Sequence, residues 1–205
     1  MLYSAAAVRT AFDELGQQYI ELSMSLTPAQ LELAGLGQWS VRQLLGHAIR
    51  AFSTAAANLD ATPTVEFAVH TPGDYYRAAF SSGPTIHAEI AERGVHAGIA
   101  LGPDVAATVS STVTKARARI RAADDDDIVN HFTGRIPFVA YLATRVVEAG
   151  VHLLDLQRAL GLPVAIDPGS AEIVLLTLAS TGDVNQMILA LTGRGDLPAG
   201  FNVLQ

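Results

Sequence analysis

The sequence contains no cysteine, and Lys115 is the only lysine among its 13 basic residues. The absence of cysteine excludes disulfide bonds and any thiol nucleophile supplied by the protein itself. No run of basic residues occurs, and the acidic residues outnumber the basic ones to give a net charge of −7. A chain of this charge is a poor match for a nucleic-acid backbone, so we expect no nucleic-acid partner.

Long apolar runs are also missing. No stretch approaches the roughly 18 uninterrupted apolar residues that a membrane-spanning helix requires, so we expect no membrane partner. The first residues lack the basic segment and apolar core of a secretory signal. These absences favour a cytoplasmic location.

The sequence has enough hydrophobic residues to form a substantial core. Half of its 205 residues are hydrophobic and only 16% are charged, which argues against disorder and supports a substantial folded domain. We predict a bundle domain over residues 1–163 and a short C-terminal helical extension, packed on the bundle, over residues 164–205.

Apolar residues recur at the three-and-four spacing of an amphipathic helix in four long segments, namely 8–26, 40–59, 103–120 and 134–160. Gly134 and Pro137 are expected to start the last of these. Shorter helices are expected near 73–81 and 84–93, and after Pro168 and Asp183. No segment shows sustained strand alternation. The predicted fold is therefore an all-α four-helix bundle, an architecture that often places metal ligands on facing helices.

Two histidines and one glutamate form the main candidate site. His47 lies in the second segment, while Glu148 and His152 stand four apart in the longest, which places both on one helix face. Two His and one Glu with an open fourth position is a known catalytic zinc arrangement. The alternative is an exposed Glu–His pair with a separately packed histidine. Because core residues directly follow Glu148 and His152, we place both at the core margin, which favours a metal.

Three nearby residues have weaker signals. Asp155 shares the face of His152 and could orient its imidazole as a hydrogen-bond acceptor, or could instead accept from Arg158. Arg145 could bind an acidic substrate group, although an i, i+3 salt bridge to Glu148 is the simpler interpretation. His131 falls in a predicted loop and has no ligand spacing.

Three segments carry a family resemblance: Trp39-Ser-Val-Arg-Gln-Leu-Leu-Gly-His47, Glu148-Ala-Gly-Val-His152-Leu-Leu-Asp155-Leu and Leu189-Ala-Leu-Thr-Gly-Arg194. The first two are similar to the W-x-V-x-x-L-x-x-H and E-x-x-x-H-x-x-D-L motifs of the mycothiol-dependent maleylpyruvate isomerase family, within the DinB-like superfamily. The third resembles the C-terminal signature of its shorter members. The resemblance spans nearly the whole chain.

The resemblance implies a DinB-like bundle with a divalent metal, usually zinc, held by His47, Glu148 and His152. The same donor set also suits nickel, iron or manganese. Arg194 matches a family arginine thought to serve the active site, and its alternative role is a favourable interaction with a helix C-terminus.

We therefore expect a metal-dependent enzyme that uses a low-molecular-weight thiol, mycothiol or similar, for transfer to a small electrophile or for its isomerisation. Because the chain has no cysteine, the thiol must come from a cosubstrate. The alternative is a non-catalytic DinB-like bundle that binds a metal or ligand. Metal-assisted hydrolysis also stays open, and the alanine-rich helix stripes allow a homodimer.

Overall fold

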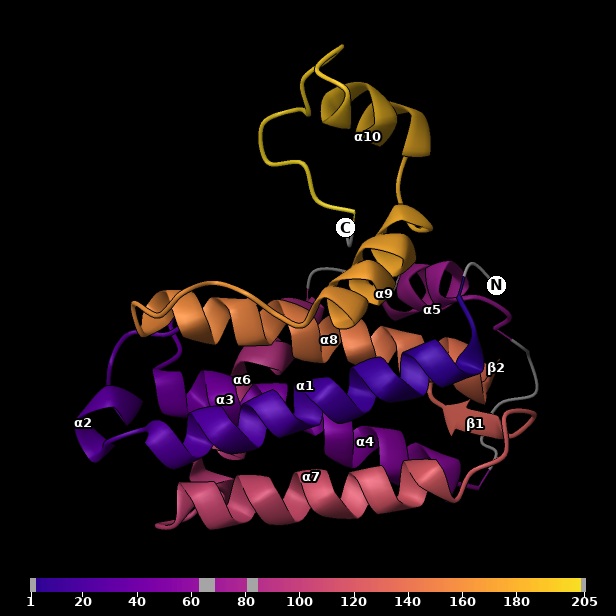
Figure 1. Cartoon of the computed structure of the whole chain (residues 1–205). Helices are drawn as coiled ribbons and strands as arrows, with labels where there is room; N and C mark the ends of the chain where they lie inside the picture. The colour runs from indigo at the N-terminus through magenta and orange to yellow at the C-terminus, as the bar shows by residue number, and fades with distance from the viewer. Residues whose placement is uncertain (1–2, 63–68, 81–84, 204–205) are drawn as a thin grey trace.

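The computed structural model describes residues 3–62, 69–80 and 85–203, with the backbone alone for 85–89. Over these residues the chain is mostly helical, with one small hairpin, which confirms the predicted all-α bundle (Figure 1). The bundle is built from α1 (Ala5–Ser25), α3 (Val41–Ala48), α4 (Arg50–Leu59), α7 (Val105–Arg121) and α8 (Phe138–Ala159).

The core lies between α1, α4, α7 and α8. Helix α1 packs on α7 and α8, and α4 packs on the same two helices. The predicted apolar stripe of α1 is buried as expected: Val8, Phe12, Leu15 and Tyr19 are all fully inaccessible. The Tyr19 hydroxyl donates a 2.8 Å hydrogen bond to the carbonyl of Ala149. This bond satisfies a polar group that would be costly to bury alone.

The prediction of a single helix over residues 40–59 is wrong. The structure divides this segment at Ile49 into α3 and α4. Ile49 has a ψ of −11°, well away from the helical value, and its carbonyl accepts from Phe52 three residues later. Because of the break, the two helices pack on α8 together with different second helices. Helix α3 packs on α6 (Thr85–Ala100) and α8, whereas α4 packs on α7 and α8.

A small hairpin also departs from the prediction. Strands β1 (Ile128–His131) and β2 (Gly134–Pro137) pair antiparallel, with His131 opposite Gly134. Gly134 therefore does not start the longest helix, which begins at Phe138 after Pro137. Each strand has only four residues, too few for an alternating pattern to be recognised in the sequence. Gly134 has a φ of +133°, which a side chain would disfavour.

Helix α6 lies very close to α3 and to Trp39. A Cβ on Gly46 would lie 2.5 Å from the backbone of Ala97, and one on Gly94 would lie 2.3 Å from the Trp39 ring. The Trp39 indole N–H donates a 2.9 Å hydrogen bond to the carbonyl of Ala91. These contacts fix the indole next to the helix that carries His47. Two shorter helices complete this half of the chain, α2 (Pro28–Leu31) and α5 (Pro72–Phe80).

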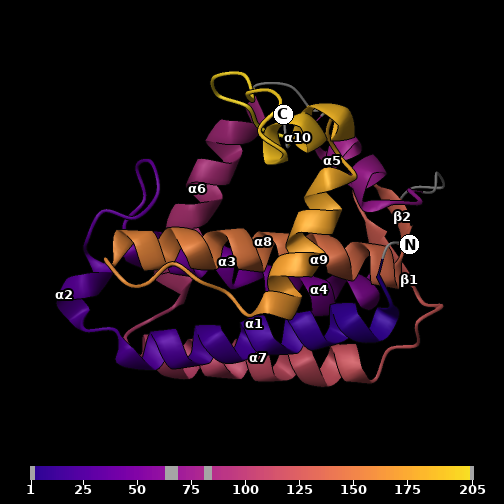
Figure 2. The same cartoon turned by 45° about the horizontal axis from the view of Figure 1, so that its top comes forward.

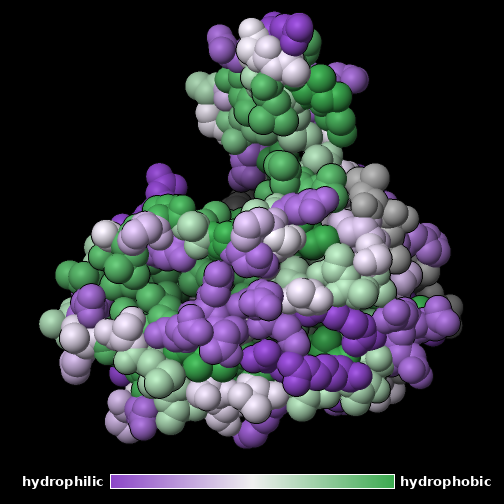
Figure 3. Space-filling view, viewed as in Figure 1, coloured by the Kyte–Doolittle hydropathy of each residue, from purple (hydrophilic) through white to green (hydrophobic). Residues whose placement is uncertain are grey.

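Beyond the bundle, α9 (Pro168–Ala179) and α10 (Val184–Leu191) begin at the predicted positions. Asp167 and Asp183 cap them by accepting backbone N–H bonds. Helix α9 packs across α1 and α8, and it rises towards α10 (Figure 2). Helix α10 buries none of its residues. It projects from the bundle and has a largely apolar surface (Figure 3). Among the described residues, no helix is both long and apolar enough to cross a bilayer.

Candidate metal site

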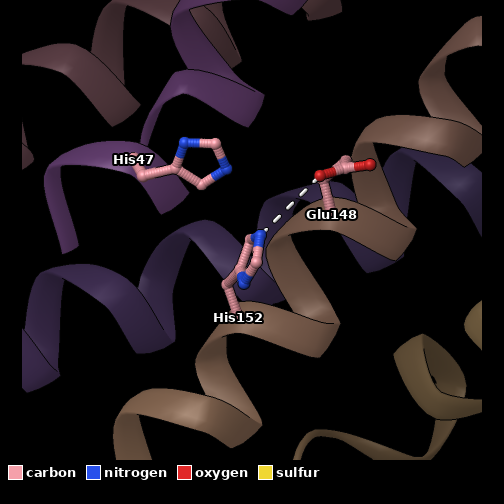
Figure 4. A group of neighbouring side chains, drawn as sticks. All are labelled: His47, Glu148 and His152. Carbon is pink, nitrogen blue, oxygen red and sulfur yellow. Dashed lines mark ion pairs between the residues drawn. The ribbon is translucent and has the colours of Figure 1, made fainter. Parts of the chain in front are cut away.

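His47, Glu148 and His152, here called the metal triad, come together although about a hundred residues separate the first from the others. His47 lies in the last turn of α3, and the other two lie one turn apart on α8, which packs against it. Each offers one ligand atom, and these atoms all lie within 4.8 Å of one another (Figure 4). All three side chains line one cavity of about 540 Å³.

The distances suit a shared ion better than direct contact. His152 Nε2 lies 3.8 Å from Glu148 Oε2, which is too long for a hydrogen bond. Two donor atoms that are each about 2.1 Å from one ion are separated by at most about 4.2 Å. The separation of His152 Nε2 from Glu148 Oε2 satisfies that limit. The three ligand atoms together span up to 4.8 Å, so small side-chain movements would bring all three to one ion.

His47 is held in the neutral form that binds metals. Burial, followed by the positive charges of His152 and three arginines, lowers the pKa of His47 to about 3. The Trp39 ring packs against the imidazole at an interplanar angle of 35°, with a centroid distance of 4.6 Å. One ring nitrogen of His47 points towards Glu148 (Figure 4), while Nδ1 is buried and has no hydrogen-bond partner among the described residues.

Asp155 lies where the sequence placed it. Its Oδ2 is 3.2 Å from Nδ1 of His152, and the alternative partner, Arg158, makes no ion pair with it among the described residues. With Nδ1 engaged by a carboxylate, His152 presents Nε2 to the cavity. A carboxylate on the far nitrogen is the usual support for a metal-binding histidine. The donor set of two imidazoles and one carboxylate is therefore compatible with a divalent metal.

Much of the rest of the cavity lining comes from residues that sequence reasoning missed. Helix α5 contributes Tyr75, Tyr76 and Phe80. His131, predicted as an isolated loop residue, instead lies in β1 and packs against the rings of Tyr75 and Tyr141. Burial and the charge of Arg145 lower the pKa of His131 to about 4. No short-range spacing links these aromatic residues, since they come from three separate elements.

Arg145 does not form the predicted salt bridge with Glu148. Its Nη2 donates a 2.8 Å hydrogen bond to the Tyr75 hydroxyl, and its Nε donates to Thr144 Oγ1 at 3.1 Å. The residue is only 9% exposed. The i, i+3 interpretation was wrong because the rings of Tyr75 and Tyr141 hold the guanidinium within about 5 Å of their centroids instead.

Arg194 is not brought to the triad. It is exposed beyond the end of α10, where its Nη1 donates a 3.3 Å hydrogen bond to the carbonyl of Thr192. It does not line the cavity, and the only residue of the C-terminal tail that does among those described is Asn202. The contact with a helix-terminal carbonyl matches the alternative role considered for Arg194.

Comparison with known proteins identifies the family of the chain. No curated protein and no solved structure matches the chain significantly. The family model described as the mycothiol maleylpyruvate isomerase N-terminal domain matches residues 12–157, more than two thirds of the chain. The matched span contains the whole metal triad and Asp155, and it excludes Arg194. The chain therefore belongs to the family of mycothiol maleylpyruvate isomerase N-terminal domains.

Proposed function

We propose that this protein is a metal-dependent enzyme that transfers a low-molecular-weight thiol to a small electrophile, or isomerises that electrophile by reversible thiol addition. His47, Glu148 and His152 would hold the metal, with zinc as the favoured ion. The observation that carries the proposal is the meeting of these three side chains at the wall of one cavity.

The cavity suits two small reactants. Its volume of about 540 Å³ falls within the ordinary range of small-molecule sites. Aromatic and aliphatic side chains contribute most of its lining, which suits the apolar parts of small substrates. The triad lines this cavity, so a metal ion held there would face the bound substrates.

A free thiol has a pKa of about 8.5, so it is mostly protonated at neutral pH. A divalent ion supplies positive charge that lowers this pKa and favours the thiolate. The protein has no cysteine, so the reacting sulfur must belong to a cosubstrate. Membership of a mycothiol-related family supports mycothiol as that cosubstrate.

The chain's own residues would position and support the ligands. The Asp155 carboxylate accepts from Nδ1 of His152, which leaves Nε2 free to bind an ion. Trp39 packs on one face of His47 and restricts rotation of its ring. Burial keeps His47 unprotonated at neutral pH. Metal affinity is thereby maintained without competition from protons.

The test combines metal analysis with a thiol assay. Purified protein loaded with zinc should contain close to one ion per chain, and it should accelerate the loss of mycothiol in the presence of 1-chloro-2,4-dinitrobenzene. Because the protein has no cysteine, a thiol reagent detects only the cosubstrate. We expect His152→Ala to lose both the metal and the activity. His96→Ala, an exposed histidine on α6, should retain both.

Two outcomes would contradict the proposal. If zinc cannot be loaded into the folded protein, the triad is not a metal site. If the metal binds but thiol loss is unaffected by His152→Ala with the helical content intact, the protein is a metal-binding bundle without this catalysis. Hydrolysis of an ester substrate that needs the metal but no thiol would indicate the water-based chemistry instead.

A further inference from the structure

Helix α10 carries an apolar stripe that stays largely exposed within the described part of the chain. Val184, Ile188 and Leu191 follow the i, i+4, i+7 spacing of one helix face. Their exposed fractions are 48%, 52% and 79%. In a soluble protein, a stripe with this period is ordinarily buried against another element. Here the helix that carries it projects away from the bundle instead (Figure 1).

The C-terminal extension exposes enough apolar surface for a stable interface. Besides the stripe, Leu175 on α9 and both Leu189 and Leu197 are at least 40% exposed. Figure 3 shows apolar side chains gathered over α10 and the adjoining end of α9. These six side chains together expose on the order of 500 Å² of apolar surface, which is large for an ordinary monomer. A standard interface takes about 800 Å² from each partner, of which about three fifths is apolar. One extension therefore supplies about the apolar area that one side of a dimer interface uses.

The composition of α10 favours a protein partner over a lipid surface. The helix contains no charged residue, whereas helices that lie on membranes are rich in lysine and arginine on their polar face. The net charge of −7 also opposes the approach of this protein to an anionic bilayer.

The charges that flank α10 suit a second copy of the same chain. Asp183 caps the start of the helix and Arg194 lies exposed beyond its end, with no other charged residue between them. Both are about equally far along the chain from Ile188, near the centre of the stripe. If two copies pack α10 antiparallel about a two-fold axis, each Asp183 meets the partner's Arg194. Parallel packing would bring like charges together.

We propose that two copies of this chain form a two-fold symmetric dimer through α10, with their stripes packed antiparallel and Ile188 beside the axis. A contact of this kind uses the same patch on both copies, so one apolar surface is enough to form it. Burial of the stripes supplies the affinity. The pairs of Asp183 and Arg194 at the rim fix the orientation more than the strength. The dimer does not depend on the metal triad.

Sedimentation velocity over a concentration series tests the proposal on the full chain. We expect a species of twice the 21.5 kDa mass of one chain at high concentration. Ile188→Glu places two carboxylates in the centre of the contact and should raise the dimer dissociation constant at least about 100-fold. Gln186→Glu adds the same charge to the opposite face of the same helix. This matched control should leave the dimer intact. Arg194→Glu should weaken the dimer by only about threefold to tenfold, because it acts at the rim.

The absence of cysteine allows a second test that leaves the rest of the contact in place. A single introduced cysteine can form a disulfide only with the same position of a second copy. A disulfide requires Cα atoms within about 7 Å of each other. Antiparallel packing brings the two copies of position 188 together, and it separates the two copies of position 184 by about two helical turns. Ile188→Cys should therefore crosslink under oxidation, and Val184→Cys should not.

The proposal is overturned if the protein sediments as a monomer throughout the series, or if Ile188→Glu dimerises as well as Gln186→Glu does. Equal crosslinking at positions 184 and 188 would contradict the antiparallel arrangement. A monomer that binds phosphatidylglycerol vesicles through Ile188 would make a lipid surface the partner instead. Ile188→Glu should load zinc and consume thiol as the unmodified protein does, so failure of the dimer is distinguished from failure of the proposed function.

Discussion

The metal triad and Arg145 line one cavity, but different kinds of contact hold their side chains in position. Two members of the triad come from a single helix turn, with their side chains 16% and 30% exposed. Arg145 lies on the same helix yet depends on Tyr75 from α5 and Thr144 beside it for its hydrogen bonds. Helix spacing sets two members of the triad relative to each other, whereas tertiary packing sets the surroundings of Arg145.

This difference separates two tasks. The triad presents acceptor atoms, two imidazole nitrogens and a carboxylate oxygen, which attract a cation. Arg145 presents donors and a permanent positive charge, which attract an anion. We expect changes around Arg145 to leave zinc binding at the triad largely intact.

The largest effect is expected from weakening the support of the triad. Asp155→Asn removes the negative charge that faces Nδ1 of His152, and it should lower zinc affinity by about 10- to 100-fold. Competition with a chromophoric chelator measures the affinity. Asp126→Asn, an exposed acid in the loop before β1, is the matched control and should leave it unchanged. An unaltered zinc affinity in the Asp155→Asn variant would show that the Asp155 carboxylate does not support His152 as a metal ligand.

The same contrast explains what the sequence could predict. The helices and the triad follow from periodic signals, because apolar stripes recur at helical spacing and Glu148 and His152 are one turn apart. His47 could be proposed as the third ligand because it lies in another amphipathic segment, and a family motif supported that choice. Its meeting with α8 depends on helix packing, and no local pattern contains that information.

The partners of Arg145 were not predicted either, because they also depend on tertiary packing. The Tyr75 ring from α5 lies against the guanidinium, and His131 from the short hairpin packs on Tyr75, so these contacts join residues far apart in the chain. The sequence alone made an i, i+3 salt bridge the simplest partner for Arg145, since helix neighbours are the only contacts that spacing defines. The break at Ile49 was missed because the apolar stripe continues through it, and helix breaks without Gly or Pro leave little signal.

A moderate effect is expected when one of the contacts that hold the Arg145 guanidinium is removed. Tyr75→Phe removes the acceptor for Nη2, a charge-assisted hydrogen bond, and should lower the free energy of unfolding by about 1.5 kcal/mol. Tyr76→Phe is the matched control, because its hydroxyl makes only a long 3.3 Å bond to the Thr144 carbonyl. Urea unfolding measures both, with zinc affinity unchanged in either variant. Equal losses in the two variants would mean that Tyr75 does not hold the guanidinium.

The smallest effect concerns His131 in β1, whose ring packs on Tyr75 and Tyr141, the two tyrosines next to the Arg145 guanidinium. Its pKa is about 4 in the folded protein, lowered by burial and by Arg145, against about 6.5 in an unfolded chain. As the pH falls below 6.5, the unfolded state takes up a proton that the folded state refuses, so stability declines towards pH 4. Above pH 7 both states are neutral and the contribution vanishes.

His131→Gln should therefore reduce the acid sensitivity of the protein. Because His131 is partly exposed, we expect the difference in unfolding free energy between pH 7.5 and pH 5 to shrink by about 1 kcal/mol. Urea unfolding at the two pH values measures this, and the value at pH 7.5 corrects for packing lost with the imidazole. The remaining decline belongs to other groups, His47 among them. An unchanged pH dependence would mean that burial and Arg145 do not keep His131 neutral in the folded protein.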